Sequence, residues 1–187
     1  MKRINPTWTY DLHGNELLDR YGEDIYVKFM LSKGEKWAYV SDRLRVLVLR
    51  DEGGVYIDAD AEPVKPFDSV PFWDMDHVDF AYGGRSTGRK QVALARGVSF
   101  IDNTFMGSRP NGRMITILDN LWSPATVTGE GNVVNGGLCG RTIFDHQNWT
   151  CAPLGFKYIY SETLFPETIV LHDAHNLGSW RPEYKPA

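Results

Sequence analysis

The stretch SDRLRVLVLRDEGGVYIDADAEPVKPFD, residues 41–68, decides the fold. Its helical pattern ends at the pair Gly53-Gly54, and the apolar strand Val55-Tyr56-Ile57 follows. The strand leads into two aspartates, Asp58 and Asp60, whose spacing of two places both carboxylates on one face. Such oxygen ligands suit Mg²⁺ or Mn²⁺, ions that often also bind substrate phosphates. Because a D-x-D triplet also occurs in ordinary surface turns, its surroundings must decide between a metal site and a plain turn.

The composition indicates one soluble globular domain, spanning residues 1–187. A chain of this length buries about 70% of its unfolded surface, which is enough for a core without disulfides. A net charge of -4 argues mildly against a nucleic-acid partner without excluding a local basic patch. Cys139 and Cys151 have no metal-ligand spacing and are expected to be reduced core residues. No apolar run of roughly 18 residues and no signal peptide is found, so a cytoplasmic location is expected.

Helical and strand patterns alternate along the chain, and this alternation predicts an α/β fold. The predicted helices are 15–21 (capped by Asn15), 23–32, 37–51 and 111–121. The predicted strands are a short one within 1–14, then 55–57, 78–82, 98–106, 156–160 and 168–171. The prolines Pro63 and Pro66 favour an extended segment at a sheet edge, and 129–140 is a glycine-rich loop.

Asp42 and Arg45 stand three residues apart in the predicted helix 37–51 and therefore share one face. One interpretation is an intrahelical ion pair on a solvated face. The other is a ligand site, because charges within an apolar helix need a partner. A sugar could be that partner, with Asp42 accepting from its hydroxyls and Arg45 donating to them. The two residues alone leave both interpretations open.

The order S-D-x-x-R, G-G, V-Y-I-D-A-D and V-K-P-F-D resembles the sugar-binding D-x-D region of family 32 glycosyltransferases. It is also similar to the same region of the large glucosylating bacterial toxins. The matching residues are Ser41, Asp42, Arg45, Gly53, Gly54, Tyr56, Asp58, Asp60, Pro63, Lys65, Pro66 and Asp68. Weaker likenesses are NPTWTYDLH, IDNTFMGSRPN, FKYIYSETLFP and HDAHNLGSW.

The resemblance implies a GT-A-like fold of the nucleotide-diphospho-sugar transferases, with a mixed central sheet flanked by helices. The family's usual opening strand, similar to I-P-K-I-I-H-x-x-W, has no counterpart here, so a minimal, N-terminally short version is expected. The alternative is that another segment forms that wall of the nucleotide pocket.

The resemblance also implies a metal site. Asp60 would bind Mn²⁺ or Mg²⁺ directly, while Asp58 would support the metal and contact the nucleotide ribose. His175 keeps the family's spacing to Gly178 and is the preferred imidazole ligand. His172 does not keep that spacing, and a structural role fits it equally well.

The implied donor site draws on several parts of the chain. Asp42 and Arg45 would hold the donor sugar, and Asn103 would reach towards the sugar or the attacking hydroxyl. The residues expected to contact the nucleotide and its diphosphate are Tyr56, Asp58, Ser179 and Trp180.

The function implied is a metal-dependent, retaining glycosyltransferase that uses a UDP- or GDP-sugar and an unidentified acceptor. No pair of nucleophiles stands out, so same-face attack by the acceptor hydroxyl is expected. The alternative is a non-catalytic sugar-nucleotide or glycan-binding module derived from such an enzyme. A metal-dependent phosphohydrolase is a third interpretation, but the carboxylate and histidine clusters typical of two-metal sites are missing from the sequence.

Overall fold

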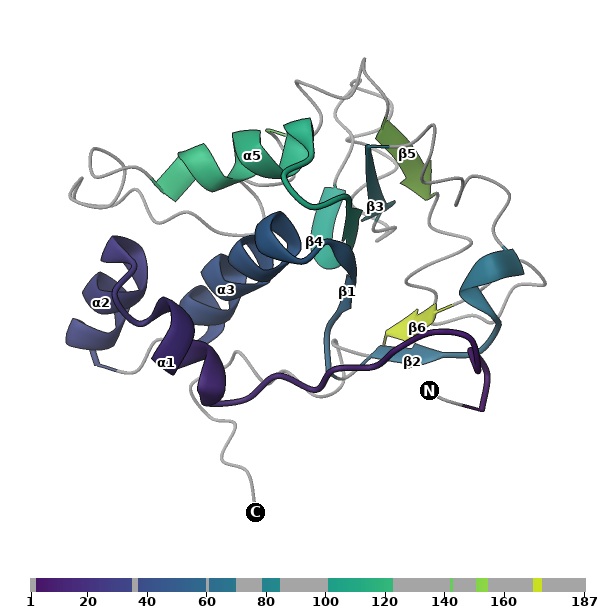
Figure 1. The fold of residues 1–187 in the computed structure, drawn as a ribbon, viewed down its shortest axis with the longest axis horizontal. Helices are drawn as coiled ribbons and strands as arrows, with labels where there is room; N and C mark the ends of the chain where they lie inside the picture. Colours follow the sequence, from purple (N-terminus) through teal and green to yellow (C-terminus); the bar gives the residue numbers. More distant parts are fainter. Residues whose placement is uncertain are drawn as a thin grey trace, which may run out of the picture.

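The computed structural model describes residues 3–34, 37–59, 61–69, 79–84, 101–122, 142, 151–154 and 170–172. Their helices lie together beside a small group of strands (Figure 1). The helices are α1 (Glu16–Tyr21), α2 (Ile25–Ser32), α3 (Trp37–Asp51) and α5 (Arg113–Asp119), with 3-10 turns at Phe67–Ser69 and Asn120–Trp122. The strands are β1 (Gly54–Ile57), β2 (Ala61–Pro63), β3 (Phe80–Gly84), β4 (Ile101–Ser108), β5 (Cys151–Leu154) and β6 (Val170–His172).

Four strands form a mixed sheet in the order β1-β4-β3-β5. β4 runs antiparallel to both β1 and β3, whereas β3 and β5 run parallel. β2 and β6 form a separate antiparallel pair. The combination of helices with a mixed sheet confirms the predicted α/β class.

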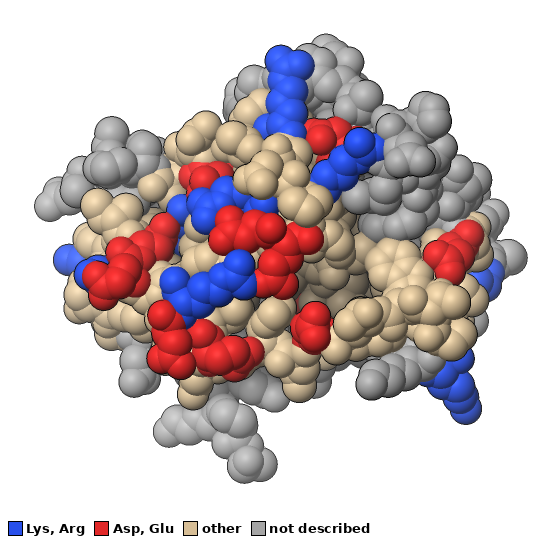
Figure 2. Space-filling model, viewed as in Figure 1, with Lys and Arg blue, Asp and Glu red and all other residues tan. Residues whose placement is uncertain are grey.

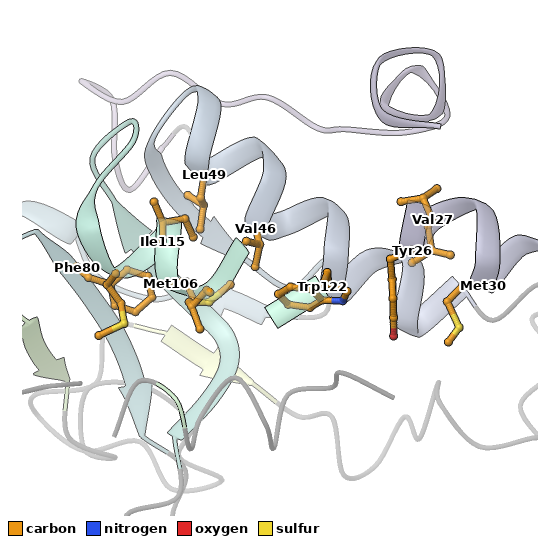
Figure 3. Close-up of a cluster of buried hydrophobic side chains, with 12 residues drawn as sticks. Tyr26, Val27, Met30, Val46, Leu49, Phe80, Met106, Ile115 and Trp122 are labelled. Carbon is orange, nitrogen blue, oxygen red and sulfur yellow. The ribbon is translucent and has the colours of Figure 1, made fainter. Parts of the chain in front are cut away.

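The core lies between α3, α5 and the strands β3 and β4 (Figure 3). Its centre is formed by Val46, Leu49, Phe80, Met106 and Ile115, each no more than 2% exposed. Trp122 extends the core towards α2, where the neighbouring buried side chains are Tyr26, Val27 and Met30. Because α3 contributes buried side chains over much of its circumference, it is the element around which the other helices are arranged.

The connection from α3 to β1 requires two glycines. Gly53 has φ 70° and Gly54 has φ 92°, backbone conformations that residues with a Cβ rarely adopt. At Gly53 a Cβ would also lie 2.5 Å from Cδ of Pro110. The N–H of Asn111 donates to the carbonyl of Arg50 at 2.7 Å and fixes this end of α3 against the loop after β4. Gly53 is therefore the left-handed cap that ends α3.

Buried charge also holds α3 in place. The Arg43 side chain, 6% exposed, pairs with Asp24 at 2.7 Å and with Asp119 at 2.5 Å. These carboxylates precede α2 and end α5, so one guanidinium joins three helices. Arg50 adds a second pair to Asp119 at 2.9 Å. Figure 2 shows basic and acidic side chains interleaved on the face that carries α1 and α3.

Most of the predicted elements within the described residues are confirmed. Helix 37–51 agrees with α3 residue for residue, and the bounds of α2, β1, β3, β4 and β6 lie within three residues of the predicted ones. The predicted helix 111–121 is divided into α5 and a 3-10 turn. The extended segment expected near Pro63 is β2, and strand 156–160 and loop 129–140 lie outside the described residues.

Three predictions need correction. Residues 3–14 contain turns and irregular backbone but no strand, and β5 was not predicted. Asn15 takes the N-cap position of α1 but makes no side-chain cap hydrogen bond, because its backbone is already helical. The cap that does form is at α2, where Asp24 accepts from the N–H groups of Tyr26 and Val27 at 3.0 and 3.1 Å.

Among the described helices, none has the length and apolar character required to cross a bilayer.

Candidate active site

Arg45 links α3 to the end of β1. Its Nη2 lies 3.2 Å from Oδ1 of Asp42, and its Nη1 lies 3.1 Å from Oδ1 of Asp58. The Arg45 side chain is 7% exposed and the Asp42 side chain 15%, so their ion pair does not lie on a solvated face. The structure thus brings together three of the residues selected from the sequence, on one guanidinium.

The orientation of this guanidinium is fixed by further contacts. Arg45 donates through Nε to the carbonyl of Ser41 at 3.3 Å and through Nη2 to the Ser41 hydroxyl at 3.2 Å. Its Cζ lies over the Tyr56 ring, 4.5 Å from the centroid. A planar, five-donor group held on several sides loses little freedom when a ligand arrives. Ser41 stands one helical turn before Arg45, and this i, i+4 spacing is the sequence signal for the contact.

Tyr56 completes the cluster from the strand. Its hydroxyl donates to Oδ1 of Asp58 at 2.7 Å. Burial raises the pKa of Tyr56 above its ordinary value; Arg45 opposes this rise, and the Asp58 carboxylate adds to it. The phenol therefore stays protonated at neutral pH and remains a donor to Asp58. The Asp58 Oδ1 atom thus pairs with the Arg45 guanidinium and accepts a hydrogen bond from the Tyr56 phenol.

After Asp58 the chain turns back on itself. The N–H of Ala61 donates to the carbonyl of Asp58 at 3.0 Å, and β2 begins at Ala61. Asp60 comes between these two residues in the sequence but is outside the described residues, so its metal role stays a prediction.

The pairing of β2 with β6 brings a distant part of the chain to this turn. Ala61 is the register partner of His172, the last residue of β6. The HDAHNLGSW segment begins at His172, so its backbone starts beside the D-x-D turn. His175, Ser179 and Trp180 follow outside the described residues, and their roles stay predictions.

Asn103 belongs to β4, and only its backbone is described. Phe105, two residues later, is the register partner of Ile57, which directly precedes Asp58. Asn103 therefore stands at the end of the sheet where the chain leaves β1, and the role of its side chain stays a prediction.

The ligand set predicted for a metal lies only partly within the described residues. Among these residues, no three His, Cys, Asp or Glu side chains gather closely enough to hold an ion. Asp58 contributes a carboxylate, a hard oxygen ligand of the kind that Mg²⁺ and Mn²⁺ prefer. The expected partners of Asp58 in the metal site, Asp60 and His175, fall outside these residues.

Comparison with known proteins supports the resemblance found in the sequence. Residues 7–75 match the model of a family described as a glycosyltransferase sugar-binding region containing a DXD motif. The matched range includes α3, β1 and the contacts of Arg45 with Ser41, Asp42, Tyr56 and Asp58, so this part of the chain is similar to the D-x-D region of glycosyltransferases. No curated protein sequence matches the chain significantly.

One solved structure similar to the chain is titled "PaToxG Glycosyltransferase". The sequences are 19% identical, and the TM-score is 0.49. The match covers 73% of this chain and 46% of that one, so the chain spans less than half the length of this solved structure.

Proposed function

We propose that this chain is a metal-dependent, retaining glycosyltransferase that uses a nucleotide-sugar donor. The observation that carries the proposal is the contact of Arg45 with both Asp42 and Asp58. It joins the helix expected to hold the sugar to the strand end expected to hold the metal and the nucleotide. The match of residues 7–75 to a glycosyltransferase sugar-binding region agrees with this assignment.

The contacts of Asp58 favour different roles for the two aspartates in a metal site. Oδ1 of Asp58 already faces the Arg45 cation and accepts from Tyr56, which makes it a weaker direct ligand than an unengaged carboxylate oxygen. This arrangement supports Asp60 as the direct ligand, with Asp58 in the supporting role and His175 completing the set. When bound, Mn²⁺ or Mg²⁺ would supply Lewis-acid stabilisation of the departing diphosphate.

The protein side chains would orient the donor. Asp42 accepts from sugar hydroxyls, and Arg45 donates to the sugar from a position fixed before the donor arrives. Donors that need no reorganisation stabilise charge developing in the transition state better than mobile ones do. Asn103 would reach the sugar or the attacking hydroxyl, and Ser179-Trp180 would close over the diphosphate of a UDP- or GDP-sugar.

Retention of stereochemistry follows, in this proposal, from same-face attack. The acceptor hydroxyl approaches on the side from which the diphosphate leaves, and the leaving group takes up its proton. No covalent sugar–enzyme intermediate is required.

Substitution of Asp60 by Asn tests the proposal. Asp60→Asn keeps the side-chain size but removes the charge, so sugar transfer and donor hydrolysis should fall at least 100-fold while the melting temperature stays nearly constant. Asp19→Asn, at an exposed position of α1, is the matched control and should retain full activity. Equal activity in both variants would contradict a metal-dependent transferase.

The donor and acceptor can be found by a screen of nucleotide sugars against acceptors, with Mn²⁺ present and products identified by mass spectrometry. Binding of a nucleotide sugar without transfer or hydrolysis would support the non-catalytic module instead. Release of inorganic phosphate from nucleotides without sugar transfer would support a phosphohydrolase.

A further inference from the structure

The N-terminal segment Asn5–Trp8 is hydrogen-bonded to Phe67 and Asp68, which follow the D-x-D turn and β2. Oδ1 of Asn5 accepts from the N–H of Phe67 at 2.6 Å, and Asn5 is only 1% exposed. Nε1 of Trp8 donates to Oδ1 of Asp68 at 3.0 Å, and the Thr7 hydroxyl donates to Oδ2 of Asp68 at 3.4 Å. Two consecutive residues, 67 and 68, are therefore held by side chains about 60 positions earlier in the chain.

A row of aromatic rings continues from this contact to the sheet. The Trp8 and Phe67 rings meet edge to face at 5.3 Å, and the Phe67 and Phe105 rings do so at 6.3 Å. Phe105 is the register partner of Ile57 in β1. The N-terminal segment is thus connected through Phe67 to the strand that delivers Asp58.

The turn after β1 is therefore restrained on both sides. On its near side, Asp58 is held by Arg45 and Tyr56. On its far side, the chain passes through β2 to Phe67, which is 4% exposed. Only a few residues separate β2 from Phe67, so a displacement of Phe67 would be transmitted to β2 and to the turn.

We propose that Asn5, Trp8 and Asp68 are positioning residues that act through Phe67 to fix the D-x-D turn. The inference rests on the proposed function, because it requires this turn to bind a metal–nucleotide complex. These residues need not touch the donor. They restrict the backbone at Asp58 and Ala61, which flank the turn, so that Asp58 is already in place when the metal arrives.

Two variants weaken the contact to different degrees. Asn5→Ala removes the acceptor for the Phe67 N–H. Trp8→Phe keeps an aromatic ring against Phe67 but removes the donor to Asp68. Tyr21→Phe is the matched control, because it also removes one hydrogen bond to a carboxylate, from Tyr21 to Asp51 at 2.9 Å, in the N-terminal part of the chain.

Mn²⁺ binding is measured by calorimetry with UDP present, and again with GDP, alongside thermal melts of each variant. Asn5→Ala and Trp8→Phe should raise the dissociation constant for Mn²⁺ by about 3- to 10-fold, which corresponds to about 0.6–1.4 kcal/mol. Tyr21→Phe should leave the dissociation constant for Mn²⁺ within twofold of the wild-type value. This should hold even if its melting temperature falls as much as those of Asn5→Ala and Trp8→Phe. In a donor-hydrolysis assay, the weaker Mn²⁺ binding of these two variants should appear as a higher Mn²⁺ concentration at half-maximal activity.

The possible outcomes separate this inference from the function on which it rests. Equal effects of all three variants on Mn²⁺ binding, or no effect of any, would overturn the positioning role and leave the transferase proposal standing. A wild-type protein that binds neither nucleotide in a Mn²⁺-dependent way would overturn both.

Discussion

Arg45 in the middle of α3 and Asp58 at the end of β1 form an ion pair, with Nη1 3.1 Å from Oδ1. The pair makes the helix and the strand end a single unit, since the same guanidinium also holds Asp42. Breaking a buried pair by removing one partner is costly, because the other charge is left without compensation. Under the proposed function, donor binding and stability therefore depend on the same side chain.

Arg45→Lys should damage both properties. A lysine ammonium lacks the planar fork that reaches Asp42 and Asp58 together, and it cannot stack in the same way on Tyr56. The specificity constant for sugar transfer should fall about 100-fold, equivalent to about 2.7 kcal/mol. The free energy of unfolding should fall by about 1–3 kcal/mol, as measured by urea titration.

The matched control for that substitution is Arg50→Lys. Arg50 also pairs with two carboxylates, those of Asp51 and Asp119, but on the helical side of the molecule. The Arg50→Lys variant should be less stable than wild type. Its rate of sugar transfer, measured well below its melting temperature, should change little. Similar catalytic losses in the two variants would show that Arg45 acts through stability alone.

Gly53→Ala should destabilise the fold more than Gly34→Ala. Both glycines have positive φ, 70° and 87° respectively, so each alanine carries backbone strain of about 1 kcal/mol. At Gly53 the new Cβ would also meet Cδ of Pro110 at 2.5 Å, whereas nothing lies within 4 Å at Gly34. Urea unfolding should show a loss of about 2–4 kcal/mol for Gly53→Ala and about 1 kcal/mol for Gly34→Ala. Equal losses would mean that the contact with Pro110 has no energetic weight.

Local signals explain which elements could be predicted from the sequence. Helix 37–51 was predictable because an apolar pattern of helical period ends at a glycine pair, and both features act within one or two turns. β5 was not, since Cys151–Leu154 is short, contains Pro153 and is formed by pairing with β3, far away in the sequence. Local propensity carries no information about such a partner.

The site shows the same division between local and tertiary information. The Asp42–Arg45 pair follows from helical spacing, and it was predictable as one of two interpretations. The contact of Arg45 with Asp58 depends on how β1 returns along α3 after Gly54, which is a tertiary relationship. The docking of Asn5 and Trp8 on residues 67 and 68 is likewise invisible to any local pattern.

Tyr21 should make stability fall at high pH. Burial, and then the hydrogen bond to Asp51, raise the pKa of Tyr21 to about 12, whereas an unfolded tyrosine titrates near 10. The folded state therefore favours the protonated phenol, and its contribution is complete below about pH 10 and is lost as the pH rises towards 12. Urea unfolding at pH 8, 9, 10 and 11 should show a steeper loss above pH 10 for wild type than for Tyr21→Phe, the difference reaching about 1–2 kcal/mol near pH 11 to 12. Between pH 8 and 9 the two proteins should differ by a constant amount, which serves as the internal control. Parallel curves up to pH 11 would show that the pKa of Tyr21 is not raised in the folded protein.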